Sequence, residues 1–314
     1  MRRFVMIGLA ALALLAAPVR AADTIRIIVP FAAGGPADML ARLLAQELQG
    51  SLGATLVVDN RGGAGGILGT DLAARAAPDG RTLLVATLGS QLISAALQPH
   101  PGYDPIKSFE PIALIGSSPA LLVVGPSIAA NSLKELIEIG KTRKLTYASS
   151  GPGTTMHISG ELLNAGGGIK ATHVPYRGAA PGLVDVIAGH VDIMIADPPV
   201  LLPHVANKSV RPLALFGSAR TPLLPEIATA RELGFPDMIM ENWYGVLVPA
   251  GVPSELIARL ETAVLAALQT PVSKERLATG NLGGTLGREA FKAKLDKDNA
   301  YWEPAVKRLG ITAE

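Results

Sequence analysis

The sequence predicts an α/β protein of two lobes, in which helices cover both faces of each sheet. Two observations support this prediction. Short β-branched or apolar runs alternate along the chain with longer runs whose apolar residues recur at helical spacing. In addition, glycines, prolines and capping residues stand between these runs, where strands and helices begin or end.

Five runs are predicted to be strands, namely residues 25–29, 55–58, 82–86, 145–147 and 193–196. The first run is short and β-branched, and the last is apolar throughout, as in a buried strand. The glycine-rich segment 62–66 follows one of these runs and is predicted to be a flexible loop that packs a helix close to the sheet.

Four helices are predicted in addition. The first begins at Pro36 and carries leucines at helical spacing within residues 40–48. A capping box at residues 132–135 begins the second helix, and Gly140 is expected to end it. The third is residues 182–188, ended by Gly189, and the fourth has an apolar stripe within residues 256–268.

The N-terminus has the pattern of a secretory signal peptide. Arg2 and Arg3 precede an apolar run, residues 4–17, and small residues lead up to Ala21. We therefore expect a signal peptide at residues 1–21, which leaves 293 residues (314 minus 21), enough for two domains. The apolar run is shorter than the ~20 residues of a membrane span, although an uncleaved anchor is the alternative.

The mature chain is expected to be a free, soluble exported protein. It has no cysteine, which a lipid-anchored export product would need at its cleavage site. Its charge is close to balanced, because removal of the three leader arginines leaves 25 Lys+Arg (28 minus 3) against 26 Asp+Glu. Since aromatic residues are also few, the sequence lacks the basic and stacking surfaces of a nucleic-acid-binding protein.

Two segments are candidates for chain crossings between the lobes, residues 116–119 and 241–245. We predict that lobe 1 is discontinuous, formed by residues 22–117 and 244–314, and that lobe 2 is formed by residues 118–243. Two crossings would together form a hinge.

Two glycine-rich turns, each between a strand and a helix, are the main candidates for a binding site. Such turns direct free backbone N–H groups at whatever lies before the helix, which is how a protein binds an anion without a charged side chain. Facing each other across a cleft, they would bind a small carboxylate. They contribute the candidate residues Phe31, Ala32, Gly34, Gly35, Pro36, Ala37 and Asp38, and Ser149, Gly153, Thr154, Thr155 and His157.

Ser90, Tyr176 and Asp197 complete the candidate ligand-binding residues. Asp197 follows a predicted buried strand, where open α/β sheets bind ligands, but it could instead cap the next helix. Tyr176 either walls the cleft or packs at the lobe surface.

Several of these residues also have a structural interpretation. Asp38 in the first turn of a helix suits a capping role better than contact with an anion, unless the ligand also carries an amine. His157 is equally suited to helix packing. For Trp243, packing is the favoured role.

Other function classes fit less well. Residues 62–66 lack the third glycine of a dinucleotide-binding motif, since position 68 is Leu68, and this argues against a cytosolic nucleotide enzyme. No histidine pair has the spacing of a zinc site. An exported hydrolase would use Ser149 or Ser150 as its nucleophile, with His173 and Asp197, but neither serine lies in a G-x-S-x-G motif.

The order of several motifs resembles one family over nearly the whole mature chain. The motifs are residues 29–38, 59–66, 78–84, 149–157, 174–178 and 189–192. In this order they resemble the substrate-binding proteins of tripartite tricarboxylate transporters, the Bug-type periplasmic receptors. Ala33, Arg81 and Arg177 depart from residues that are common at these positions, and none of these departures removes the predicted anion site.

The resemblance implies a type II periplasmic-binding-protein fold with two lobes that close around a ligand. It also implies that a carboxylate lies between residues 31–38 and 149–155, held largely by main-chain N–H groups and ordered water. The expected protein is a periplasmic monomer without enzymatic activity, cofactor or metal. Its expected partners are the membrane subunits of a transporter or, alternatively, a sensor kinase, and the identity of its ligand does not follow from the resemblance.

Overall fold

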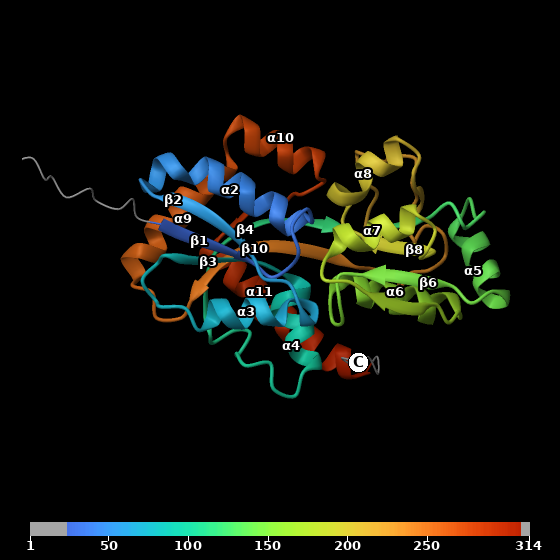
Figure 1. The fold of residues 1–314 in the computed structure, drawn as a ribbon, viewed down its shortest axis with the longest axis horizontal. Coiled ribbons are helices and arrows are strands. Elements are labelled where there is room, and N and C mark those ends of the chain that lie inside the picture. Colours follow the sequence, from blue (N-terminus) through green and yellow to red (C-terminus); the bar gives the residue numbers. More distant parts are fainter. Residues whose placement is uncertain (1–23, 309–314) are drawn as a thin grey trace, which may run out of the picture.

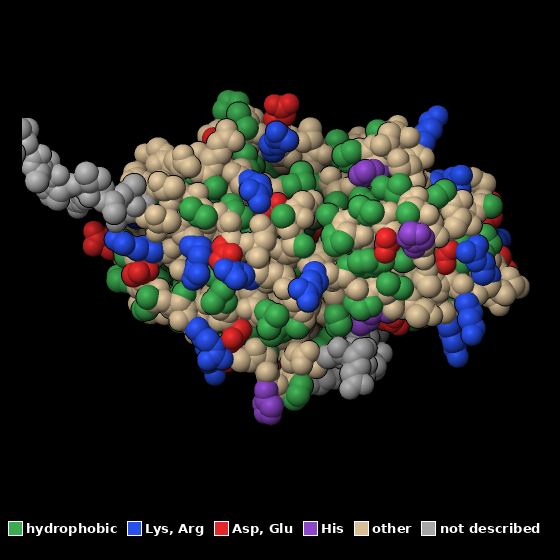
Figure 2. All heavy atoms as spheres, in the orientation of Figure 1, with side chains coloured by type: hydrophobic (Ala, Val, Ile, Leu, Met, Phe, Trp, Pro, Cys, Tyr) green, Lys and Arg blue, Asp and Glu red, His purple; other side chains and the backbone are tan. Residues whose placement is uncertain are grey.

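The fold consists of two sheets with helices packed on their faces, which confirms the predicted two-lobe α/β architecture. A computed structural model describes residues 24–308, so the predicted signal peptide, residues 1–21, lies outside the described part. Figure 1 shows the two sheet layers side by side along the long axis of the molecule. On the face drawn in Figure 2, acidic and basic side chains are interspersed.

The first sheet has six strands in the order β11-β4-β10-β3-β1-β2. Its strands are β1 (Thr24–Val29), β2 (Thr55–Asn60), β3 (Thr82–Thr87), β4 (Phe109–Pro119), β10 (Glu241–Pro249) and β11 (Leu286–Gly287). Strand β1 pairs in parallel with β2 and β3, whereas β10 is antiparallel to both β3 and β4. The parallel strands therefore end at the same edge, where the turn after β1 lies.

The second sheet has five strands in the order β7-β6-β8-β5-β9. Its strands are β5 (Leu121–Val124), β6 (Thr146–Ser149), β7 (Thr172–Pro175), β8 (Ile193–Ala196) and β9 (Arg211–Leu215). Strand β6 is parallel to β7 and β8, so the turns after these three strands gather at one edge.

The helices follow the strands as the alternating pattern predicts. Those near the first sheet are α2 (Pro36–Leu52), α3 (Ile67–Ala74), α4 (Ser94–Leu97), α9 (Ser254–Leu268), α10 (Pro271–Thr279) and α11 (Arg288–Arg308). Those of the second lobe are α5 (Leu133–Thr142), α6 (Thr155–Gly167), α7 (Ala179–Ile187) and α8 (Pro198–Ala206). A 3-10 turn, Ala64–Gly66, and a wide helical turn, Gly89–Ile93, precede α3 and α4.

The predicted starts of the first two helices are confirmed. Helix α2 has Gly35 as its N-cap and Pro36 in its first turn. Helix α5 has Ser132 as its N-cap, and the Ser132 hydroxyl accepts a hydrogen bond from the Glu135 N–H at 3.2 Å.

Two predicted helix boundaries are wrong, and both involve a glycine that packs against another element. Helix α5 continues past Gly140 to Thr142, and a Cβ at Gly140 would lie 3.0 Å from the Ile169 side chain. Helix α7 begins at Ala179 rather than Gly182, where a Cβ would lie 3.1 Å from Tyr176. These glycines allow close packing inside the helices and do not mark their ends.

The chain passes between the sheets along paired strands. Strand β4 ends at Pro119 just before β5, and Ser118 pairs with Asn242 of β10. The predicted lobe boundaries, 117/118 and 243/244, therefore fall inside β4 and β10, and the division into lobes at these residues stays a prediction. Trp243 on β10 is fully buried, and its Nε1–H donates to Asp298 at 2.9 Å, as its predicted packing role requires.

Candidate ligand-binding site

The turn between β1 and α2 is held in shape by its own polar groups. Gly34 has a φ of +87°, a left-handed conformation that favours glycine. Its N–H donates to Asp38 Oδ2 at 2.9 Å, and Arg42 Nε donates to the same oxygen at 3.0 Å. Across the lobes, the Ala32 N–H donates to the Arg177 carbonyl oxygen at 3.0 Å.

Asp38 is therefore occupied within its own turn. Burial of its carboxyl group opposes ionisation, but hydrogen bonds from Arg42 and from the Gly34 N–H outweigh burial and hold the pKa of Asp38 below its usual value. The ionised side chain fixes the turn that precedes α2, which is a structural role, as the sequence favoured. The N–H that it binds belongs to Gly34, before the helix, rather than to the first turn of α2.

The turn between β6 and α6 is built in a similar way. Gly151 and Gly153 have φ values of +121° and +74°, and a Cβ at Gly153 would lie 2.7 Å from Ser94 Cα. The Gly153 N–H donates to His157 Nδ1 at 3.1 Å, and the Gly151 N–H donates to Ser149 Oγ at 3.0 Å. The hydroxyl of Thr154 caps α6 by accepting from the His157 N–H at 3.4 Å.

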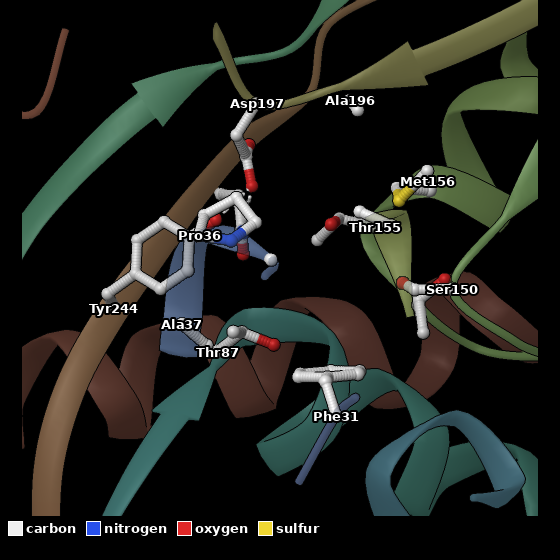
Figure 3. A pocket seen from close by; sticks show the side chains of 14 residues that line it. Phe31, Pro36, Ala37, Thr87, Ser150, Thr155, Met156, Ala196, Asp197 and Tyr244 are labelled. Carbon is white, nitrogen blue, oxygen red and sulfur yellow. Dashed lines mark hydrogen bonds between the residues drawn. The ribbon is translucent and has the colours of Figure 1, made fainter. Parts of the chain in front are cut away.

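The two turns open on one cavity between the lobes (Figure 3), with a volume of about 40 Å³. Its lining comes from the ends of β1, β3, β6 and β8, the first turns of α2, α6 and α7, and strand β10. The lining residues are Phe31, Gly35, Pro36, Ala37, Thr87, Ser150, Thr154, Thr155, Met156, Ala179, Ala196, Asp197, Asn242 and Tyr244.

Four backbone N–H groups at this cavity have no acceptor among the described residues. They belong to Gly35 and Ala37 at the start of α2 and to Thr155 and Met156 at the start of α6. N–H groups in the first turn of a helix have no partner within the helix, and the helix dipole adds partial positive charge there. The cavity thus receives two electropositive helix ends.

The structure brings together seven of the fifteen predicted site residues, which line the cavity: Phe31, Gly35, Pro36, Ala37, Thr154, Thr155 and Asp197. The other eight lie behind or beside it: Ala32, Gly34, Asp38, Ser90, Ser149, Gly153, His157 and Tyr176. Most of these eight shape the turns or pack nearby. Ser90, for example, is fully buried and exchanges hydrogen bonds with Thr87.

The side chains of Tyr176 and His157 pack against other protein groups and do not line the cavity. The Tyr176 hydroxyl donates to Asp185 Oδ2 at 2.5 Å, next to a surface hollow apart from the cavity. The ring of His157 stacks on the ring of His173, with centroids 4.0 Å apart. Burial lowers the pKa of His157 to about 4, so its ring is neutral at pH 7.

Asp197 reaches the cavity but does not cap α8 with its side chain. Its Oδ2 accepts hydrogen bonds from Asn242 Nδ2 at 2.7 Å and from the Tyr244 hydroxyl. Burial raises the pKa of Asp197 to about 6, although these two hydrogen bonds favour the ionised form. Asp197 therefore links the end of β8 to strand β10 of the other sheet.

Six lining residues were missed from the sequence: Thr87, Met156, Ala179, Ala196, Asn242 and Tyr244. Ser150 also lines the cavity and lies within the predicted ligand-binding turn, residues 149–155. Some carried a usable signal, because Thr87 and Ala196 stand at the carboxyl ends of strands, where α/β sheets bind ligands. Asn242 and Tyr244 lie in a crossing strand far along the chain and carry no local motif.

Buried Ser149 and half-buried His173 form a pair outside the cavity. Ser149 Oγ lies 2.5 Å from His173 Nε2, and Ser149 is fully buried and does not line the cavity. Asp197, the acid that a hydrolase triad would need, binds Asn242 and Tyr244 instead. The pair therefore lacks the access to substrate that a nucleophile requires.

The glycine-rich segment 62–66 contacts the other lobe beside the cavity. A Cβ at Gly65 would lie 1.9 Å from the Pro152 carbonyl oxygen, and Ser94 Oγ donates to the Gly65 carbonyl oxygen at 2.9 Å. Residues 24–308 contain no cluster of three acidic or histidine side chains placed to hold a metal ion. In the same range, no helix combines the length and apolar character that crossing a membrane requires.

Comparison with known structures defines the class of the protein as a periplasmic binding protein. The periplasmic binding protein BugD is 32% identical, with a TM-score of 0.88 over 92% of this chain and 98% of BugD. MatC from Rhodopseudomonas palustris, solved with bound malate, is 32% identical, with a TM-score of 0.85 over 92% of this chain and 99% of MatC. An R. palustris protein solved with adipate is 33% identical, with a TM-score of 0.87 over 92% of this chain and 98% of that protein.

The chain belongs to the tripartite tricarboxylate transporter receptor family. The sequence profile of the tripartite tricarboxylate transporter family receptor matches residues 40–311. BugT of Bordetella pertussis is 36% identical over 271 residues, which cover 84% of this chain and 83% of BugT. The family and fold are those of solute-binding receptors, and the resemblance inferred from the sequence motifs is confirmed.

Proposed function

We propose that this chain is an extracytoplasmic receptor that captures a small organic carboxylate between its lobes and delivers it to a tripartite tricarboxylate-type transporter. One observation carries the proposal. The first turns of α2 and α6 open on the same cavity, with N–H groups of Gly35, Ala37, Thr155 and Met156 that have no acceptor among the described residues. An anion between two helix N-termini satisfies these donors.

The energetics are adequate for a receptor. An anion at one partly buried helix N-terminus gains up to about 2 kcal/mol, and each hydrogen bond to a charged group adds about 1.5–3 kcal/mol. Two helix ends with four N–H groups therefore supply enough for micromolar binding, which requires about −8 kcal/mol. Malate and adipate in the related structures are ligands of the same chemical class.

The receptor acts by binding alone and without catalysis, as a monomer that is soluble in the periplasm after cleavage of residues 1–21. Ligand would favour the arrangement in which the lobes contact each other, because a ligand shifts an equilibrium only by its differential affinity for the two states. The transporter would recognise this closed arrangement.

Thermal unfolding in the presence of candidate ligands tests the proposal. The purified protein, stripped of ligand by unfolding and refolding, is heated with mono-, di- and tricarboxylates, amino acids and aromatic acids. A ligand at 100 times its Kd should add about 2.7 kcal/mol to the free energy of unfolding. A shift with a carboxylate supports the proposal, whereas a folded protein that responds to none of them contradicts it.

The membrane partner is tested separately. Crosslinking in ligand-treated cells, followed by purification of the receptor, should recover the membrane subunits of a transporter. Recovery of a sensor kinase instead would keep the binding function and replace the transport role with a sensory one.

A further inference from the structure

One wall of the ligand cavity carries a hydrogen-bond acceptor that the protein leaves unused. Asn242 lines the cavity and is 3% exposed. Its amide nitrogen Nδ2 donates to Asp197, and this contact fixes the orientation of the amide because a carboxylate oxygen can only accept. The remaining atom, Asn242 Oδ1, is buried and has no hydrogen-bond partner within residues 24–308. A buried acceptor without a donor is unfavourable, so it favours a ligand that donates.

Asp197 adds a second acceptor to the same wall. Its Oδ2 already accepts from Asn242 and Tyr244, whereas its Oδ1 accepts from no described residue. Figure 3 shows the carboxyl group of Asp197 directed toward the part of the cavity where Pro36 and Thr155 lie. Two oxygens, Asp197 Oδ1 and Asn242 Oδ1, are thus held by neighbouring side chains and lack donors.

The charges around the cavity favour a cation at this wall. Of the described residues that line it, Asp197 is the one with a charged side chain, and none is a lysine, arginine or histidine. A second carboxylate on the ligand would meet these acceptors without a cationic side chain to balance it. An ammonium group has three donors and a positive charge, so it matches both the acceptors and the acid.

We infer that the ligand is a carboxylate that also bears an ammonium group, which makes it an amino acid in chemical class. The N–H groups of α2 and α6 bind its carboxylate, and Asp197 Oδ1 and Asn242 Oδ1 accept hydrogen bonds from its ammonium group. This inference rests on the proposed receptor function and narrows its ligand class.

Tyr244 has a positioning role in this arrangement. Its hydroxyl donates to Asp197 Oδ2 from a fully buried position on β10, so Asp197 Oδ1 stays directed away from that strand. Burial raises the pKa of Asp197 to about 6, which leaves the carboxylate ionised at neutral pH and costly to bury without a cation. A bound ammonium group offsets that cost.

Calorimetric titration with two matched sets of acids tests the inference on the full exported chain. One set is propionate, lactate and L-alanine, and the other is succinate, L-malate and L-aspartate. Within a set, the members differ only in carrying hydrogen, hydroxyl or ammonium beside the carboxylate. The ammonium member of at least one set should bind about tenfold or more tightly than its unsubstituted partner, because charge-assisted hydrogen bonds are the stronger ones.

The variant Asp197→Asn should lose this preference while it still binds the unsubstituted acid. Asp237→Asn is the matched control, because Asp237 is exposed and does not line the cavity, and it should keep the preference. The relative affinities of the six acids are measured on the unmodified protein. They therefore test the inference even if Asp197→Asn folds poorly.

The outcomes separate this inference from the receptor function. Binding of unsubstituted acids as tightly as amino acids overturns the inference and leaves the receptor function standing, and so does a preference for the hydroxyl members. If none of the six acids binds, thermal unfolding with the wider set of candidate ligands described under Proposed function tests the inference. A hit on an amino acid supports the inference, a hit on a carboxylate without an amine overturns it alone, and complete silence overturns it together with the receptor function.

Discussion

The Ala32 N–H donates a hydrogen bond to the Arg177 carbonyl oxygen at 3.0 Å and so joins the turn after β1 to the turn after β7. Strands β1 and β7 belong to different sheets. A second contact lies nearby, where Gly65 meets the Pro152 carbonyl oxygen. Both contacts connect the lobes through backbone atoms beside the cavity, and they depend on small residues that allow the chains to approach closely.

Gly65→Ala should separate the lobes. The added Cβ would lie 1.9 Å from the Pro152 carbonyl oxygen, so the two loops cannot keep this distance. If the fraction of molecules whose lobes contact each other falls to about a tenth of its value in the unmodified protein, ligand affinity falls about tenfold. Calorimetry measures the affinity, and small-angle X-ray scattering of the ligand-free variant should show a larger radius of gyration than that of the ligand-free unmodified protein.

Gly53→Ala is the matched control for this change. Gly53 has a φ of +62°, close to the +64° of Gly65, but a Cβ there meets nothing within 4 Å. Both variants share the strain of a left-handed alanine, about 1–2 kcal/mol. Equal affinity losses in the two variants would show that backbone strain, and not the contact between the lobes, caused the effect.

Asp38→Asn should destabilise the protein by about 1–2 kcal/mol, because a buried charged group that binds both Arg42 and the Gly34 N–H loses its charge. Asp71→Asn is the comparison, since it removes a similar pair with Arg75 on an exposed helix face, where such pairs contribute about 0–1 kcal/mol. Urea denaturation measures both. A loss for Asp38→Asn no larger than for Asp71→Asn would contradict its role in the turn.

The stacked histidines should make the protein less stable in acid. Burial lowers the pKa of His157 to about 4, and burial together with repulsion from His157 lowers that of His173 to about 4, both from 6.5. Between about pH 6.5 and about pH 4, the unfolded chain therefore binds more protons, and the free energy of unfolding falls as the pH falls. This loss is absent above about pH 6.5.

His157→Asn should reduce this acid loss, because asparagine can still accept from the Gly153 N–H but does not titrate. Urea denaturation at several pH values in this range gives the slope of the free energy of unfolding against pH. His100→Asn replaces an exposed histidine and should keep the slope of the unmodified protein. If His157→Asn has the same slope as the unmodified protein, His157 does not cause the loss of stability in acid.

Asp197 should have the opposite pH dependence. Burial raises its pKa from 3.8 to about 6, so the folded protein holds the proton more tightly than the unfolded chain does. The free energy of unfolding should therefore fall by about 3 kcal/mol as the pH rises from about 4 to about 6. Asp197→Asn should remove this component from the pH profile, and identical profiles would contradict the raised pKa.

The fold was predictable because its signals are local. Strands and helix starts depend on neighbouring residues, as at Gly35 and Pro36, and these predictions are confirmed. Gly140 and Gly182 misled the prediction of helix boundaries because their small size is needed for contacts with Ile169 and Tyr176. Such contacts with distant residues leave no pattern beside the glycine in the sequence.

The cavity could be predicted only in part, for the same reason. The glycines, prolines and threonines of the two turns made them recognisable in the sequence, and both turns lie at the cavity. Asn242 and Tyr244 lie on β10 and donate hydrogen bonds to Asp197, which stands 45 and 47 residues earlier in the chain. Asp38 and His157 have the chemistry of ligand-binding residues, but partners within their own turns occupy them.

The central claim, that main-chain N–H groups bind a carboxylate, is tested most directly by calorimetry on Ala37→Pro. This change removes one N–H from the second residue of α2. Helix α8 already begins with two prolines, Pro198 and Pro199, so the first turn of a helix in this chain accommodates such a pair. Ala37→Ser is the control, since it keeps the N–H at the same place.

Ala37→Pro should bind the carboxylate found in the thermal panel about tenfold or more weakly than the unmodified protein, since a hydrogen bond to a charged group is worth about 1.5–3 kcal/mol. Ala37→Ser should retain affinity within about threefold, a difference of well under 1 kcal/mol. Equal affinity of Ala37→Pro and the unmodified protein, with both variants folded, would contradict the account.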